Sequence, residues 1–209
     1  ATSSMGNETW LPWRYGSVES GVMSAAFETP LAFDVTGAVP NDYICQLCEE
    51  WEVSEDELTV TFKLREGIQF HDGWGEMTSE DFLYLWNRGI QEDSIWTPKT
   101  RIAKAGVTLE ADGPYKLIMK GEKRYPRVIL DFGVKYGQVS SKRYIETVGE
   151  DEAAKRMIGT GPFRMVEHEV GSHVRYEALD EHWRQVPYFK TIIIKKVPEE
   201  ATRIAMLKA

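Results

Sequence analysis

A strict alternation of apolar and polar residues over positions 58–65 constrains the fold of this chain more than any other feature. Four apolar side chains fall on one face of this segment: Leu58, Val60, Phe62 and Leu64. A period of two is that of a β-strand with one buried face, so the segment is predicted to be a strand. The acidic turn at residues 54–57 predicts that this strand folds back on residues 51–53 as a hairpin.

Other segments show the same pattern of short strands joined by tight turns. Residues 107–111 are predicted to pair with residues 115–120 around the turn Asp112-Gly113-Pro114. Residues 163–169 are predicted to pair with residues 174–179 around residues 170–172. The apolar runs 128–132 and 191–197 are predicted to be two further strands. Most of these neighbours are antiparallel, which favours an α/β to α+β fold over a purely parallel sheet.

Two segments carry the start signals of helices. Thr78 is predicted to be the N-cap of one helix, with Asp81 reaching back to it from the third helical position. The buried face of this helix is predicted to carry Phe82, Leu85, Trp86 and Ile90. Ser140 or Ser141 is predicted to cap a second helix that ends at Gly149.

The length and composition are those of an ordinary globular protein. The chain has 209 residues, 42% of them apolar and 28% charged, which fits one large domain or two small ones. A net charge of −8 and the lack of a Lys/Arg cluster exclude a nucleic-acid partner. No apolar run reaches the roughly 20 residues that would span a membrane. Seven Trp, nine Tyr and eight Phe predict either a large core or a surface that stacks on a ligand.

The two ends of the sequence predict a trimmed fragment of a longer protein. The first residues lack the basic and apolar regions of a signal peptide, as expected for either a cytoplasmic protein or a mature, trimmed product. Residues 198–209 are predicted to form a helix with a buried stripe made of Ala201, Ile204, Ala205 and Leu207. No Gly or Asn ends this helix, and a frayed natural terminus is the alternative explanation.

Motifs of the common enzyme classes are missing from the sequence. There is no Gly-x-Ser-x-Gly elbow, and none of the four His residues matches a triad signature. Residues 159–161 begin like a dinucleotide-binding fingerprint, but no third glycine follows and the next segment is a predicted strand. Glu49 and Glu50 are adjacent in sequence, which suits a solvated face better than an acid–base dyad. We therefore expect neither catalytic residues nor a cofactor.

Two short motifs are similar to redox or metal sites but have simpler explanations. Cys45 and Cys48 form a Cys-x-x-Cys pair in a predicted short helical stretch, with no second pair to complete a zinc site. We expect buried or partly buried thiols there, with a local disulfide as the alternative. His71-Asp72-Gly73 is predicted to be a turn in which Asp72 accepts backbone hydrogen bonds and Gly73 takes a positive φ. A metal ligand is the weaker alternative for this turn, and no metal site is predicted.

The order of the segments resembles that of a known family. The blocks that carry the resemblance are residues 47–54 (LCEEWEVS), 58–73 (LTVTFKLREGIQFHDG), 78–82 (TSEDF), 159–163 (GTGPF), 179–183 (LDEHW) and 198–207 (PEEATRIAML). Over essentially its whole length, the chain is similar to the family 5 extracellular solute-binding proteins of ABC importers, the receptors for oligopeptides, dipeptides and nickel. It departs from the family pattern at Cys48, where Ala is usual, at Gly75-Glu76, where a Pro-containing turn is usual, and at residues 179–183, where Asn-Pro-x-Tyr-Trp is usual.

The resemblance implies a type II periplasmic-binding-protein clamshell, of which this chain would be one incomplete lobe. Residues 1–41 and 142–209 would form the central sheet of that lobe, and residues 42–141 an inserted subdomain. The second lobe would be absent from this chain. The implied location is the periplasm or the extracellular face of the cell membrane. Membrane contact would run only through the permease or through a lipid anchor outside these residues, as in a lipoprotein.

The resemblance also implies a set of ligand-binding residues. They are Trp13, Tyr15, Gly16, Ser17, Trp96, Thr160 and Gly161. Residues 13–20 correspond to the loop that lines the family's cleft, where main-chain groups would hold an extended peptide. Trp96 would stack on a side chain or a sugar ring, with a place in the core as an equal alternative. Three other tryptophans are assigned to packing: Trp51, Trp86 and Trp183.

We therefore expect a monomeric, non-enzymatic receptor that captures a peptide and passes it to the membrane subunits of an ABC permease. An oligosaccharide-, nickel- or other solute-binding member of the same family is the close alternative. A carbohydrate-active enzyme with an aromatic cleft and a signalling receptor on the same clamshell are the alternatives from other classes.

Overall fold

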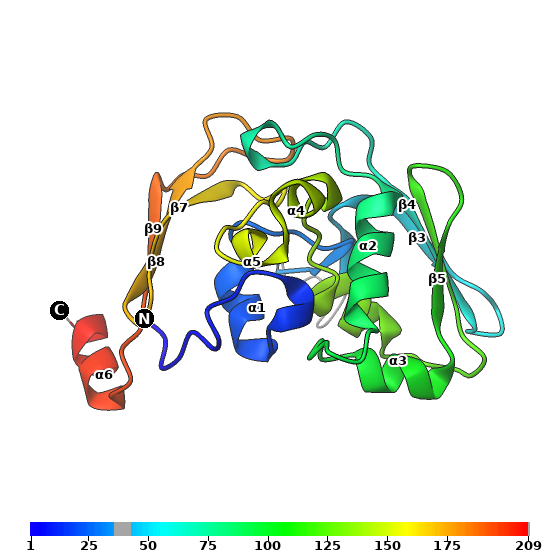
Figure 1. Ribbon diagram of the computed structural model, residues 1–209, viewed down its shortest axis with the longest axis horizontal. Coiled ribbons are helices and arrows are strands. Elements are labelled where there is room, and N and C mark those ends of the chain that lie inside the picture. Colours follow the sequence, from blue (N-terminus) through cyan, green and yellow to red (C-terminus); the bar gives the residue numbers. More distant parts are fainter. Residues whose placement is uncertain (36–42, 209) are drawn as a thin grey trace.

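Three antiparallel sheets organise the part of the chain that the structure describes, residues 1–35 and 43–208 of a computed structural model (Figure 1). The first sheet pairs β1 (Leu31–Phe33) with β2 (Tyr43–Cys45). The second has the order β3-β4-β6-β5, with β3 (Cys48–Val53), β4 (Thr59–Leu64), β5 (Thr108–Ala111) and β6 (Lys116–Lys120). The third has the order β7-β8-β9, with β7 (Phe163–Glu169), β8 (His173–Ala178) and β9 (Thr191–Lys195).

Strand β4 confirms the alternation that the sequence shows. Val60, Phe62 and Leu64 are buried, while β3 and β6 pair with β4 on its two sides. The three predicted hairpins, β3-β4, β5-β6 and β7-β8, all form with antiparallel register. Each of these pairs is local in sequence, and the turn residues between the strands set the register.

One carboxylate organises the start of two helices, α2 (Ser79–Gly89) and α4 (Lys142–Val148). The Thr78 amide donates to Asp81 Oδ2 at 2.9 Å, as the predicted capping box requires. The Lys142 amide donates to Asp81 Oδ1, also at 2.9 Å. Burial raises the pKa of Asp81, and these backbone donors oppose that rise. Ile90 does not join the buried face, because it lies just past the helix end and is exposed.

The remaining helical elements lie between and beside the sheets (Figure 1). They are η1 (Pro12–Arg14), α1 (Ser17–Met23), η2 (His71–Gly73), α3 (Lys99–Ala105), η3 (Ile129–Tyr136), α5 (Glu150–Ala153) and α6 (Glu200–Lys208). Helix α4 has Ser141 as its N-cap and Gly149 as its C-cap, as predicted.

Several local predictions are wrong. The apolar run at residues 128–132 leads into the π-helix η3 instead of a strand. A helical turn there places Asp131 in the interior, where Arg101 Nε and Arg127 Nε reach it at 2.8 and 3.2 Å. Cys45 and Cys48 stand at the ends of β2 and β3 instead of in a helix, and both are free thiols, the first partly buried and the second buried.

The Asp72 turn and the C-terminal helix also differ from expectation. Gly73 has the predicted positive φ, but Asp72 has one as well, and its carboxylate pairs with Arg156 and Arg164 instead of with backbone amides. Helix α6 forms as predicted, but its apolar stripe is not buried, and Leu207 is 89% exposed.

The apolar side chains form two separate cores. The first core lies under β4 and α2 and includes Phe62, Phe82, Trp86 and Phe132. The second core lies against the β7-β8-β9 sheet and includes Met5, Trp10, Met23, Phe27 and Tyr176. In Figure 1, that sheet and the β3-β4-β6-β5 sheet stand on opposite sides of the molecule, with α1, α4 and α5 between them. The predicted boundary between residues 41 and 42 lies outside the described residues.

Candidate functional site

The loop before α1 begins with Trp13, whose ring is 2% exposed. Its Nε1 donates to Glu150 Oε2 at 3.3 Å, and the Arg88 guanidinium lies 5.5 Å from the ring centroid. Arg88 Nε also donates to Glu150 Oε1 at 2.6 Å, and this contact lowers the pKa of Glu150. The Trp13 ring therefore holds η1 against α2 and α5 and offers no open face to a ligand.

Tyr15 and Gly16 fix the next turn of this loop. The Tyr15 ring is 1% exposed, and its hydroxyl donates to Gln138 Oε1 at 2.6 Å. Burial raises the pKa of Tyr15 well above its usual range, so the hydroxyl stays a donor. Gly16 is the N-cap of α1, and its amide donates to Glu19 Oε2 at 3.2 Å. Ser17 is the first residue of α1.

Trp96 lies beside this loop, although about 80 residues separate the two in sequence. The Ile95 amide donates to the Trp13 carbonyl at 3.0 Å, which joins the two segments directly. The Trp96 ring is 2% exposed, packs edge-on against Trp86, and donates from Nε1 to the Tyr136 carbonyl at 3.0 Å. The predicted stacking role of Trp96 stays a prediction, and the structure places the ring in the core.

The structure therefore brings together five of the seven predicted site residues, all on residues 13–18 and 94–96, which we call the loop surface. The aromatic rings of the loop surface point inward, and other residues face solvent. Val18 is 46% exposed, Ile95 is 54% exposed, and the Arg14 side chain is 37% exposed. Val18 lies in the predicted cleft loop of residues 13–20, but neither it nor Ile95 was among the predicted binding residues, because no periodicity marks an exposed face there.

Thr160 and Gly161 lie elsewhere, near the other end of α1. The Gly161 amide donates to the Ala26 carbonyl at 2.9 Å, three residues beyond the end of α1. A helix of this length spans about 10 Å, so these two residues do not share one cluster with Tyr15 and Gly16. Thr160 instead borders a pocket of about 510 Å³ that is also lined by His71, His182 and Trp183.

A buried carboxylate, Glu28, forms the back of this second region. It is 2% exposed and accepts a hydrogen bond from Gln46 Nε2 at 3.4 Å and three more from groups more than 130 residues away in sequence. These three donors are Thr160 Oγ1 at 3.1 Å, Trp183 Nε1 at 3.1 Å and Arg184 Nη2 at 2.9 Å. Thr160 and Trp183 therefore both hydrogen-bond to this carboxylate. Through these two bonds Glu28 brings the GTGPF and LDEHW segments together in the fold.

His71 is the buried titratable group of the same region. Its Nε2–H donates to the Gly161 carbonyl at 2.7 Å, and the ring is almost fully buried. Burial lowers the pKa of His71, although the contacts to backbone carbonyls oppose the change. The neutral imidazole is therefore the form that the folded protein holds.

His71 is expected to make the protein less stable as the pH falls. Unfolded chains take up a proton at His71 near pH 6.5, whereas the folded protein resists it until a lower pH. His71 therefore makes its full contribution to the free energy of unfolding above pH 6.5. This contribution is lost as the pH falls from 6.5 towards the pKa of His71 in the folded protein. In urea unfolding, wild type should lose up to about 1.4 kcal/mol more than His71→Gln between pH 7.5 and 5.5. Equal losses in the two proteins would contradict this assignment, and the variant serves as the control for the other three His.

Metal and membrane features are absent from the residues that the structure describes. No group of three or more His, Cys, Asp or Glu side chains in residues 1–35 and 43–208 is placed to hold a metal ion. No helix within the same residues has the length and apolar character needed to cross a bilayer.

Comparisons with known proteins agree on one family. The family model of the bacterial extracellular solute-binding proteins, family 5, matches residues 42–209. The dipeptide-binding protein of Escherichia coli (strain K12) is 26% identical over 184 residues, which cover 78% of this chain and 34% of that protein. The chain thus spans about a third of the length of the curated relatives that it matches.

Solved structures show the same fold. MoaA of A.tumefacien R10, in complex with mannopinic acid, superposes with a TM-score of 0.82 at 23% identity, over 99% of this chain and 42% of that chain. DppA of Helicobacter pylori, in complex with the peptide STSA, superposes with a TM-score of 0.81 at 19% identity, over 97% of this chain and 43% of that chain. The described residues therefore have the fold of one part of a periplasmic binding protein.

Proposed function

The chain belongs to the family 5 bacterial extracellular solute-binding proteins, and we propose from this that it is part of a receptor that captures a peptide outside the cytoplasm and delivers it to an ABC permease. The family match over residues 42–209 carries the proposal. The dipeptide-binding relative and the peptide complex of DppA support a peptide as the solute. The mannopinic acid complex of MoaA keeps a sugar-derived acid as the second candidate.

We propose the loop surface as the part of the ligand cleft that this chain contributes. Its buried rings, Trp13, Tyr15 and Trp96, fix the backbone of residues 13–18 and 94–96, so that main-chain groups meet a ligand without reorganising. Val18 and Ile95 add exposed aliphatic contacts beside those groups. Thr160 and Gly161 would then act on the ligand only indirectly, through the segment after α1 that they contact at Ala26 and Glu28.

The proposed lobe consists of a central sheet from residues 1–41 and 142–209 and an inserted subdomain from residues 42–141. The second core supports this division, because its members come from residues 5–27 and 157–176. The first core draws mainly on the inserted segment but also includes Leu11, Trp13 and Ile158, which would fix the subdomain to the sheet. We propose that the whole receptor acts as a monomer in the periplasm or on the outer face of the membrane.

The test is a ligand screen on the whole receptor beside the 209-residue chain. A pool of di- and tripeptides should raise the melting temperature of the whole receptor, since ligand at 100 times Kd adds about 2.7 kcal/mol of stability. The 209-residue chain should show no shift and no micromolar isotherm, because one wall of a cleft leaves a ligand largely in solvent. A micromolar isotherm from this chain alone would contradict the shared cleft.

Two further arms of the screen separate the alternatives. A shift with mannopinic acid and none with peptides would replace the peptide by a sugar-derived solute. Release of a chromophore from an aryl glycoside would overturn the binding role in favour of a carbohydrate-active enzyme. Binding without turnover is expected, in agreement with relatives that are named as binding proteins.

A further inference from the structure

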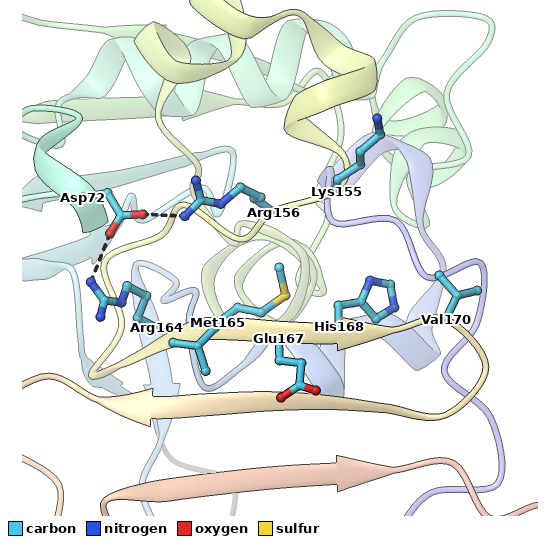
Figure 2. Close-up of a pocket in the computed structure, with 9 residues that line it drawn as sticks. Asp72, Lys155, Arg156, Arg164, Met165, Glu167, His168 and Val170 are labelled. Carbon is cyan, nitrogen blue, oxygen red and sulfur yellow. Dashed lines mark hydrogen bonds and ion pairs between the residues drawn. The ribbon is translucent and has the colours of Figure 1, made fainter.

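A groove of about 600 Å³ runs along β7, away from the loop surface (Figure 2). Residues 164–168 of β7 form one wall, and Lys155 and Arg156 form the other. Asp72 closes one end of the groove, where Figure 2 shows it between Arg156 and Arg164. Nothing in the proposed peptide cleft uses these side chains.

The strand along this groove has a free edge. Strand β7 pairs with β8 on one side, and in the described part of the chain no strand pairs with its other side. The Phe163 amide donates to the Ala25 carbonyl at 3.2 Å, but residues 164–168 make no further backbone bond of this kind to described residues. Outward backbone groups along such an edge can pair with an added strand.

The edge is selective, because two features discourage pairing with an arbitrary strand. The register of β7 against β8 shifts between Met165 and Glu167, so that Val166 is an unpaired bulge residue. Charged side chains lie close to it in sequence, with Arg164 two residues before it and Glu167 directly after it. Bulges and edge charges are the usual means of preventing edge-to-edge aggregation, and they leave room for a partner whose charges match.

The charges at the closed end of the groove match a carboxylate. Arg156 Nη2 and Arg164 Nη1 contact the two oxygens of Asp72 at 3.0 and 3.4 Å, so one carboxylate serves two guanidinium groups. Each guanidinium has five N–H donors, and these contacts use one from each. Lys155 lies farther from Asp72 (Figure 2), and its ammonium is paired with the exposed Glu152. The end of the groove therefore carries excess positive charge and spare donors.

We propose that this groove binds an extended, carboxylate-bearing segment of a partner protein, which adds to the free edge of β7. Its carboxylate accepts from the N–H donors of Arg156 and Arg164 that Asp72 leaves free. Met165, Val166 and Val170 supply apolar contacts along the groove. The groove is open along its length, so it suits a segment that remains attached to a larger protein better than a free peptide, which needs enclosure to bind tightly.

The test uses the whole receptor and a carrier protein that ends in the segment Thr-Val-Thr-Val-Thr-Val-Asp-Glu. A segment fused to a carrier does not enter a closed cleft, so a negative result here leaves the proposed peptide function untouched. Binding should slow amide hydrogen exchange in residues 164–168. Arg156→Gln should weaken binding about tenfold, the size expected for loss of a charge-assisted hydrogen bond. Arg164→Gln, which removes the other guanidinium at this end, should weaken binding in the same direction and guards against misfolding of the first variant.

Matched controls define the outcome that overturns the proposal. Arg124→Gln removes the same charge from an exposed pair with Glu57, outside the groove, and should leave Kd within about twofold. A carrier ending in Asn-Gln with an amidated terminus should bind at least about tenfold more weakly. Equal binding of the neutral segment, unchanged Kd in both Arg156→Gln and Arg164→Gln, protection confined to other residues, or no binding at millimolar concentration would each overturn the proposal.

Discussion

Glu28→Ala is expected to lower the free energy of unfolding by about 3 kcal/mol, a large part of the stability of an ordinary domain. The carboxylate is buried and accepts hydrogen bonds from Thr160, Trp183 and Arg184. Removing it leaves the Thr160 hydroxyl and the indole N–H without an acceptor inside the protein, and each unmade bond to a buried group costs about 1–3 kcal/mol. The half-exposed Arg184 turns to solvent and adds little to the loss.

Urea unfolding followed by tryptophan fluorescence measures this loss, and Trp183 lies at the altered site. Glu152→Ala is the matched control, because Glu152 is an exposed glutamate with one exposed partner, Lys155. It should leave the midpoint unchanged. A loss below about 1 kcal/mol in Glu28→Ala would show that water or a neighbouring group replaces the carboxylate, and the proposed role of Glu28 in joining these segments would be abandoned.

Local features of the fold could be predicted from the sequence, because the information for them lies within a few residues. The alternation at residues 58–65 predicts β4, and Thr78 with Asp81 predicts the start of α2. The prediction of a strand at residues 128–132 was wrong, because a short apolar segment has the same pattern in a buried strand and in a buried helix. In the helical form, Asp131 is buried and pairs with Arg101, which lies 30 residues away in sequence.

The candidate site was predictable in its segments but not in the direction of its side chains. The resemblance to the family pointed to residues 13–17 and 96, and the Ile95–Trp13 hydrogen bond joins them. Whether a Trp ring faces a ligand or the core depends on what packs against it, here Trp86 and Arg88. Glu28 was missed for a related reason, since three of its four donors come from residues more than 130 positions away.

Gly159→Ala is expected to destabilise the protein by about 3 kcal/mol or more, because a methyl group has no room at this position. A Cβ at Gly159 would stand 2.1 Å from the Ala26 carbonyl oxygen and 2.8 Å from the Phe27 ring. The backbone cannot simply move away, since the Gly159 carbonyl accepts the His71 amide at 2.9 Å. The glycine that resembled the start of a nucleotide-binding loop is thus required by close packing against the segment after α1.

Gly21→Ala is the matched control within α1, where a Cβ would meet nothing within 4 Å. Because Gly is a poor helix former, this variant should raise the free energy of unfolding by up to about 1 kcal/mol. The two Gly→Ala changes are therefore expected to move the urea midpoint in opposite directions. If Gly159→Ala were neutral, the segment after α1 would have to be free to shift, and the hydrogen bonds from Gly161 to Ala26 and from His71 to Gly159 would not be the rigid contacts described.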